Sequence, residues 1–303
     1  MTGTTPAGDR RTLTDRLTAT PVVVVALWTV WSTAFIAIKV GLSIASPAAF
    51  TLMRVMAALV ALVTLVLLRG GLRRLRDRRL HRHGVLLGAT NVVGFLVFQN
   101  LGLADSPVGV GSVLIYTQPF LVALGAWCFL HERLTVVQVA GMVIGWLGVV
   151  LVVASELDLG TTPASSVVWL LLSALSWAIG TILFKRVPSD VSVLDLLLVM
   201  NAYGALPIAV MVLVESGYVD WGVTAVLSML WAGAGASVGG LGLQFVLLRR
   251  GQAAVVSTWI FAVPVLAAAL GVLLLDETAH LALLLGGAAV AAGIYLVNTQ
   301  RRG

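Results

Sequence analysis

Residues 119–134 read PFLVALGAWCFLHERL, and residues 264–279 read PVLAAALGVLLLDETA. Pro119 pairs with Pro264 and Glu132 with Glu277 when the chain is aligned with itself at a shift of 145 positions. The same shift, without gaps, pairs identical glutamines, serines and glycines: Gln99 with Gln244, Ser112 with Ser257, Gly141 with Gly286, and Gly148 with Gly293. A shift of 146 positions pairs Trp31 with Trp177. This agreement indicates that the second half of the chain repeats the first.

The composition is typical of a protein that lies in a lipid bilayer. Of the 303 residues, 59% are hydrophobic and 11% are charged, which is too little polar surface for a water-soluble globule of this length. Runs of about 20 apolar residues, the length that crosses about 30 Å of hydrocarbon, recur along the chain. The net charge of +6 comes from short connectors between these runs, so it does not indicate a nucleic-acid partner.

The apolar runs predict an all-α membrane protein with ten transmembrane helices. Long unbroken runs disfavour a membrane β-barrel, whose strands are short segments of alternating hydrophobicity. Breaking the chain at charged, proline-rich and glycine-rich joints gives the helices 21–40, 47–68, 85–103, 107–130, 134–154, 166–186, 192–214, 223–248, 252–275 and 279–298.

The basic residues predict the orientation of these helices. With the N-terminus inside the cell, the inner connectors and tails hold 17 of the 19 Lys and Arg residues, and the remaining two are Lys39 and Arg54. Positive residues gather on the cytoplasmic side of membrane proteins. We therefore expect a multi-pass protein of the inner (cytoplasmic) membrane with both termini in the cytoplasm.

Five helices per repeat make the repeat inverted. A unit with an odd number of spans ends on the side of the membrane opposite to its start. The second copy therefore begins on that side and is inverted, as in many secondary transporters. The expected organisation is a cytoplasmic tail (1–20), a first five-helix repeat (21–154), a second five-helix repeat (166–298) and a second cytoplasmic tail (299–303).

Several motifs resemble one transporter family. They are WSTAFIAIKVGL (31–42), SPAAFTLMRVMAALV (46–60), the stretch from Pro119 to Val152, and SALSWAIGTILFKR (173–186). In this order, and with the repeat, they resemble the EamA-type exporters of the drug/metabolite transporter superfamily over nearly the whole chain. The resemblance implies an inner-membrane carrier that exports amino acids or related metabolites through a central cavity, and aromatic amino-acid exporters are among these proteins. The triplet DET at 276–278 departs from the more usual glutamate followed by a basic residue.

Arg54 is the most informative candidate residue. It lies about 10 Å along its helix from the nearer end, where a guanidinium cannot easily reach the lipid headgroups, and the resemblance places a family arginine here. Two roles are open for the Arg54 side chain: it faces the cavity, or it forms structural hydrogen bonds to backbone carbonyls. Helical phase and the repeat add further candidates for the cavity wall: Trp28, Ser32, Asn91, Phe95, Gln99, Ser112, Tyr116, Trp177, Gln244, Ser257 and Trp259. The alternative for each is a bond between helices or an interfacial anchor.

Pro119 and Pro264 are predicted to lie near the middle of the membrane and to bend their helices as hinges. Gly141, Gly148 and Gly293 predict close helix packing. The single cysteine, Cys128, is expected to be a small packed hydrophobe, and Glu132 to cap the helix that follows it.

The sequence contains no motif for a cofactor, a metal site or catalysis. It has no phosphate-binding loop and no paired cysteine ligands, so no catalytic residue, metal or cofactor is expected. No Asp or Glu falls in the middle of a predicted helix, which disfavours exchange of protons for organic cations. We therefore expect a secondary transporter for zwitterionic or neutral metabolites that works by alternating access. The alternatives are a polytopic membrane enzyme and a non-transporting scaffold or sensor.

Overall fold

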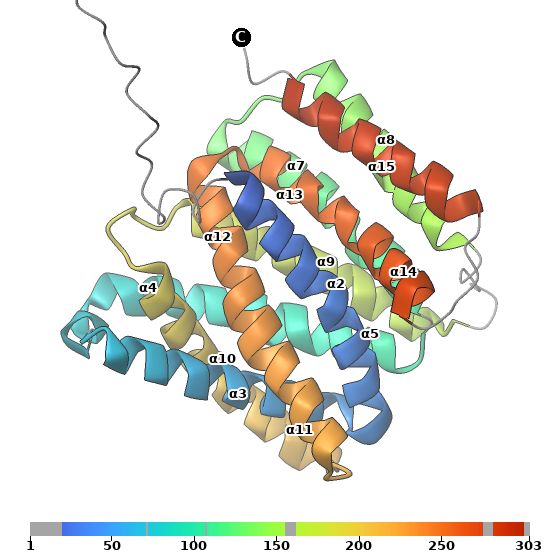
Figure 1. Ribbon diagram of the computed structural model, residues 1–303. Helices are drawn as coiled ribbons and strands as arrows, with labels where there is room; N and C mark the ends of the chain where they lie inside the picture. The colour runs from blue at the N-terminus through green and yellow to red at the C-terminus, as the bar shows by residue number, and fades with distance from the viewer. Residues whose placement is uncertain (1–19, 71, 107, 155–161, 275–280, 300–303) are drawn as a thin grey trace, which may run out of the picture.

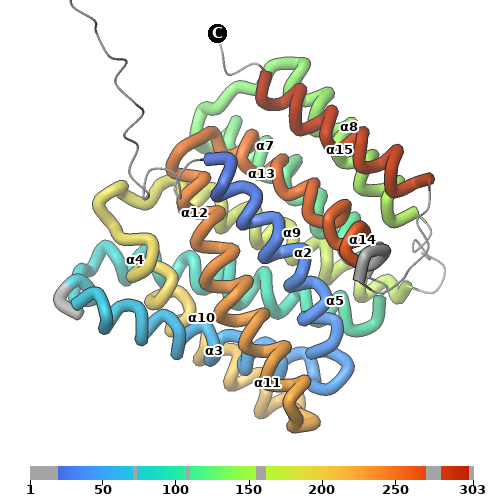
Figure 2. The backbone as a smooth tube through the Cα atoms, in the orientation of Figure 1, coloured from blue at the N-terminus to red at the C-terminus, as the bar shows by residue number. Residues whose placement is uncertain are grey.

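The computed structural model describes residues 20–70, 72–106, 108–154, 162–274 and 281–299 (Figures 1 and 2). In these ranges the regular secondary structure is helical, apart from one isolated bridge between Ala45 and Val219. The first half contains α2 (Thr20–Ile44), α3 (Pro47–Leu68), η1 (Leu72–Arg76), α4 (Arg78–Leu87), η2 (Gly88–Val97), α5 (Phe98–Ala104), α6 (Val108–Ile115), α7 (Gln118–Leu130) and α8 (Val136–Val152). The second half contains α9 (Ala164–Lys185), α10 (Val193–Glu215), α11 (Val223–Leu230), η4 (Trp231–Gly240), α12 (Leu241–Arg250), α13 (Ala253–Thr258), η5 (Trp259–Phe261), α14 (Ala262–Leu274) and α15 (Leu281–Thr299).

Nine helical segments in the described ranges are long and apolar enough to cross a membrane. α8, with 17 residues, is shorter but equally apolar. The third segment begins at Arg78 rather than at residue 85, so part of the basic run is helical. Asp77 explains the early start, because its side chain caps the helix by accepting a hydrogen bond from the backbone N–H of Arg79 at 2.8 Å.

The third and eighth segments change to π-helix in their middle, in η2 and η4. The fourth and ninth segments are interrupted at residues 116–117 and 259–261. Pro119 and Pro264 therefore lie in the first turn after an interruption, and not inside a continuous helix as expected. Proline fits such a position because its missing N–H has no helical partner there.

The two halves of the chain interleave. α10 of the second half packs on α3 and α4, and α9 packs on η2, α5 and α7 (Figure 1). α2 of the first half in turn lies along η4, α11, α12 and α14. Figure 2 shows the same arrangement, with the blue α2 beside the orange α11 and α12. Helices of each half therefore pack extensively against helices of the other half.

Glycines bring α8 and α15 together at one side of the molecule (Figure 1). A Cβ atom on Gly148 would lie 2.7 Å from the carbonyl oxygen of Gly286 and 2.8 Å from the backbone nitrogen of Val290. A Cβ on Gly141 would lie 2.8 Å from the carbonyl oxygen of Gly293. The backbones touch only because these side chains are absent, as the sequence predicted.

Two other expectations were wrong. Cys128 is exposed on the outer surface of α7 instead of packed in the core. Glu132 does not cap α8, whose N-terminus is capped by Thr135 and Gln138. The Glu132 carboxylate instead accepts hydrogen bonds from the backbone N–H groups of Ala253 and Ala254 at the start of α13, at 3.1 and 3.5 Å. Glu277 lies outside the described residues.

Replacing Gly148 with alanine should destabilise the protein. The added methyl group would force the backbones of α8 and α15 apart, and overpacking of this kind costs about 1–3 kcal/mol. Thermal unfolding of the purified protein in detergent measures the effect. Gly239→Ala is the matched control, because the atom nearest to its added Cβ lies 3.8 Å away. Equal melting temperatures for the two variants would contradict the tight contact.

Candidate functional site

Three aromatic rings from three segments meet near the middle of the helices. The ring of Trp177 (α9) lies 5.3 Å from that of Trp31 (α2) in an edge-to-face arrangement and 4.8 Å from that of Phe95 (η2). Trp177 is held in place by its indole N–H, which donates to Gln244 Oε1 at 3.3 Å. This aromatic cluster, Trp31, Phe95 and Trp177, therefore contains residues of both halves of the chain.

The Arg54 guanidinium lies beside the aromatic cluster and is nearly inaccessible to solvent, with 4% exposure. Its Nε donates to the carbonyl oxygen of Ala232 at 3.0 Å and to Ser237 Oγ at 2.9 Å, both in η4. Its Nη1 donates to Gln99 Oε1 at 3.3 Å. Among the described residues, Nη2 donates no hydrogen bond. Arg54 is thus anchored to the second half through one nitrogen and keeps N–H groups for another acceptor.

Two small cavities adjoin the aromatic cluster. One, of about 40 Å³, is lined by Phe35, Gln99 and Tyr116 together with the cluster. The other, of about 20 Å³, is lined by Asn91, Asn201 and Ser237 together with Trp31 and Phe95. Arg54, Trp31, Phe95 and Ala236 line both cavities, so they form the partition between them.

The sequence predicted twelve residues in the wall of a cavity. Six of them line one or both of these two cavities. They are Arg54, Asn91, Phe95, Gln99, Tyr116 and Trp177. They come from α3, η2, α5, α9 and the interruption between α6 and α7, which converge at this level of the bundle.

The other six suggested residues line neither cavity, and several of them join helices to one another. The Trp28 indole donates to the carbonyl oxygen of Trp259 at 2.7 Å, and Ser32 Oγ lies 3.0 Å from the carbonyl oxygen of Val263. The Trp259 indole donates to Asn298 Oδ1 at 3.3 Å. Gln244, Ser112 and Ser257 are buried outside both cavities, Gln244 as the acceptor for Trp177.

Sequence reasoning missed Ser237 and Asn201. Ser237 lies in the run WAGAGASVGG (231–240), which lacks a polar stripe at helical spacing. Asn201 lies in an apolar stretch of α10, and its amide nitrogen donates to the carbonyl oxygen of Leu197 at 2.8 Å. Both residues line the smaller cavity. The only available signal was the polar residue type itself within an apolar helix.

Some buried polar atoms near the cavities have no hydrogen-bond partner. Asn91 is 2% exposed, and neither its amide oxygen nor its amide nitrogen has a partner in the described structure. Gln244 Nε2 and Ser257 Oγ, which are buried outside both cavities, also lack a partner among the described residues. A buried amide without partners costs about 1–3 kcal/mol, so a residue such as Asn91 is unfavourable for folding alone.

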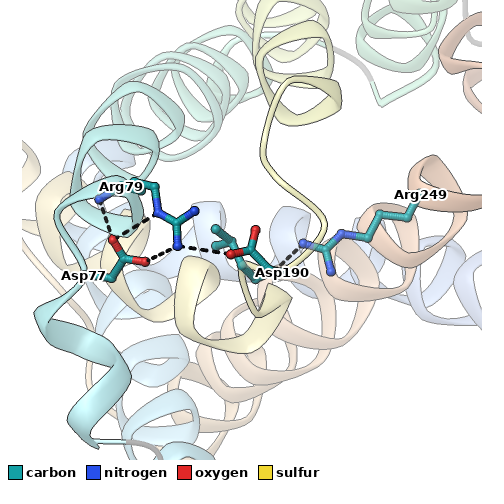
Figure 3. A network of polar contacts seen from close by, with 5 residues as sticks. Asp77, Arg79, Asp190 and Arg249 are labelled. Atoms are coloured by element: carbon teal, nitrogen blue, oxygen red, sulfur yellow. Dashed lines mark hydrogen bonds and ion pairs between the residues drawn. The ribbon is translucent and has the colours of Figure 1, made fainter.

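A network of charges joins the halves at the end of the molecule where basic residues gather (Figure 3). Arg79 forms ion pairs with Asp77 at 3.1 Å and with Asp190, in the connector between α9 and α10, at 3.0 Å. The hydrogen bond from the backbone N–H of Arg79 lowers the pKa of the Asp77 carboxyl below its ordinary value. Arg249, at the end of α12, donates to the carbonyl oxygen of Val191 beside this network.

Bonds also tie the halves at the opposite end. Glu215 Oε2 accepts hydrogen bonds from Ser46 Oγ at 3.0 Å and from the backbone N–H of Ala48 at 3.1 Å, and so caps α3. At the same end, Lys39 Nζ lies 3.4 Å from the carbonyl oxygen of Ser106, within the first half. Within the described ranges no three His, Cys, Asp or Glu side chains are grouped as metal ligands.

Comparison with known proteins identifies the family. A solved structure shares the fold with a TM-score of 0.78 at 20% sequence identity, covering 94% of this chain and 99% of that one. The chain is 26% identical to the uncharacterized transporter YvbV of Bacillus subtilis, covering 94% of this chain and 93% of the relative. It is 28% identical to a probable amino-acid metabolite efflux pump of Escherichia coli, covering 88% and 90%.

A third relative is a probable terminal-alkyne amino-acid exporter of Streptantibioticus cattleyicolor, which is 30% identical over 90% of this chain and 91% of its own length. The profile of the EamA-like transporter family matches this chain twice, at residues 20–154 and 164–299. The chain therefore belongs to the EamA-like transporter family.

Proposed function

We propose that this protein exports small amino-acid-like metabolites across the cell membrane by alternating access. The observation that carries the proposal is the position of Arg54, which lies beside an aromatic cluster at the partition between two cavities. The chain also resembles relatives named as an amino-acid metabolite efflux pump and an amino-acid exporter.

Arg54 suits the carboxylate of such a substrate. A guanidinium binds carboxylates through parallel N–H groups. Arg54 lines both cavities, and its Nη2 donates no hydrogen bond within the described part of the chain. The bond from Nε to Ala232 fixes the direction of the guanidinium in advance. A single buried cation matches one negative charge, which favours a zwitterion over a substrate with several negative charges.

The aromatic cluster suits the rest of the substrate. The faces of Trp31 and Trp177 attract a cation such as an ammonium group and also pack against an apolar side chain. Phe95 and Tyr116 extend this wall in the larger cavity. An arginine and aromatic faces in one site would bind both charges of an amino acid.

The described conformation is too compact to hold a substrate. Cavities of about 40 and 20 Å³ accept a few water molecules and no amino acid. Bonds tie the halves at both ends, through Glu132 and Arg79 at one end and Glu215 at the other. Alternating access would break the bonds at one end of the bundle at a time. The site would then open first to one side of the membrane and afterwards to the other.

We further propose ten spans in two inverted repeats, with both termini in the cytoplasm. Two lysines 146 positions apart support the inversion. Lys39 donates to the carbonyl oxygen of Ser106, and Lys185 donates at 2.9 Å to the carbonyl oxygen of Gly251. The two accepting residues lie in connectors at opposite ends of the bundle. The cytoplasmic end would be the one with Arg79, Arg186 and Arg249.

Efflux from proteoliposomes tests the function. Vesicles containing the purified full-length protein are loaded with labelled amino acids, and efflux is followed with and without a pH gradient. We expect substrate-dependent efflux, because the site matches one carboxylate and one ammonium group. Vesicles without protein are the control. The absence of flux for every amino acid would contradict the proposal and favour a scaffold or sensor.

Replacing Arg54 with alanine should reduce flux at least tenfold. The variant loses the proposed carboxylate ligand, and a charge-assisted hydrogen bond contributes about 1.5–3 kcal/mol. Initial efflux rates are compared at equal amounts of inserted protein. Arg69→Ala, which removes an exposed arginine just after the same helix, is the matched control. Unchanged flux in the Arg54 variant would exclude a role in substrate binding.

Replacing Asn91 with leucine should separate stability from transport. The leucine removes two buried amide atoms that have no partner among the described residues, so the melting temperature should stay constant or rise, while flux should fall. Asn100→Leu is the comparison, because the Asn100 amide nitrogen donates to Thr51 Oγ1 at 2.7 Å and its loss should cost about 1 kcal/mol. A stable Asn91 variant with normal flux would show that Asn91 has no part in transport.

A further inference from the structure

A large apolar groove runs along the outer surface between α7 and α9, away from the central cavities. Its volume is about 570 Å³, and its walls include Leu121, Leu124, Leu175 and Ile179. Because α7 and α9 both belong to candidate membrane spans, this groove faces hydrocarbon. Its length along α7, from Leu121 to Phe129, is about 12 Å at 1.5 Å per residue.

One basic residue marks the end of the groove. Arg186 follows the last turn of α9, is exposed, and lines the groove at the end where the basic residues gather. One of its nitrogens, Nη2, donates to the carbonyl oxygen of Phe129 at 3.0 Å, and its guanidinium lies 5.8 Å from the centre of the Phe129 ring. Within the described ranges its other N–H groups donate no hydrogen bond. They therefore remain for an anionic group at the membrane surface.

We propose that this groove binds an anionic phospholipid, with an acyl chain between α7 and α9 and the phosphate on Arg186. Charge complementarity selects the lipid class, because an apolar slot that ends at a cation matches an acyl chain that ends at an anion. Arg133, in the connector after α7, is exposed and adds to the positive potential at this end.

The second repeat serves as an internal comparison. At the shift of 145 positions, Leu270 corresponds to Gly125, which lines the groove. At the shift of 146 positions that pairs Trp31 with Trp177, Val40 corresponds to Arg186. The equivalent position between α2 and α14 thus has a larger side chain in place of the glycine and no cation. The combination of a glycine and a cation therefore occurs in the α7–α9 pair and not at the equivalent positions of α2 and α14. With the orientation proposed above, this end faces the cytoplasmic leaflet.

A second copy of the chain fits this groove less well than a lipid does. Two copies related by a two-fold axis along the membrane normal would bring both Arg186 side chains to the same depth. The like charges of the two Arg186 side chains would then repel each other. A lipid phosphate at the same place neutralises the charge.

Native mass spectrometry of the purified full-length protein tests the proposal. Phosphatidylglycerol and phosphatidylcholine with the same acyl chains are added in parallel, and bound lipid is counted. We expect one phosphatidylglycerol to bind about fivefold more tightly than phosphatidylcholine, the ratio that corresponds to about 1 kcal/mol per basic residue. Arg186→Gln should abolish this preference, whereas Arg69→Gln, at another exposed arginine, should retain it. Equal binding of both lipids, or a preference that survives Arg186→Gln, would overturn the proposal.

Cys128 supplies a second readout, because it is the single cysteine of the chain, is exposed, and lines the groove. In nanodiscs, phosphatidylglycerol should slow the alkylation of Cys128 about fivefold relative to phosphatidylcholine, and Arg186→Gln should remove the difference. Cys128→Trp should fill the groove from its exposed edge and prevent retention of the lipid. Protection that depends on two copies per disc, and not on the lipid, would assign the groove to a protein interface instead. None of these measurements depends on what the protein transports.

Discussion

Hydrocarbon offers no hydrogen bonds, and the organisation of this protein follows from that constraint. Each polar group inside the bilayer has to find its partner within the protein. Arg54 finds one in the carbonyl oxygen of Ala232, a residue of the other half of the chain. Ser173 and Ser176 of α9 similarly donate to the carbonyl oxygens of Phe95 and Thr90 in η2, at 3.0 and 3.1 Å. The polar groups therefore gather between the halves, which is also where a polar substrate would be bound.

The π-helical segments make this arrangement possible. In a π-helix the backbone bonds run from residue i to i+5, and such segments occur frequently at functional sites. Ser237 Oγ donates at 3.0 Å to the carbonyl oxygen of Ala232, five residues earlier, and accepts a bond from Arg54. η2 and η4 occupy similar places in the two repeats, and both adjoin the smaller cavity. Carbonyl oxygens that accept bonds from neighbouring helices are thus supplied by both halves.

Local patterns predicted the fold better than they predicted the site. The apolar runs and the repeat of Pro119 and Pro264 were sufficient for the helices and their order, because span length is set by the bilayer. Arg54 was predicted from its depth in the helix together with the family resemblance. Trp28 and Trp31 lie on one helical face, yet Trp28 bonds to η5 and only Trp31 reaches the cavities. That difference depends on where η5 crosses α2, which is tertiary information that helical periodicity does not contain.

The interleaving of the halves has a consequence for the synthesis of the chain. When α8 leaves the ribosome, Arg54 has no Ala232 to accept its bond, and the glycine face of α8 has no α15 to cover it. The surfaces of the first half that contact the second half therefore lack their partners until α15 has been synthesised. This dependence resembles the assembly of a dimer from two separate chains, and it suggests that the covalent link between the halves serves mainly to guarantee that each half meets its own partner.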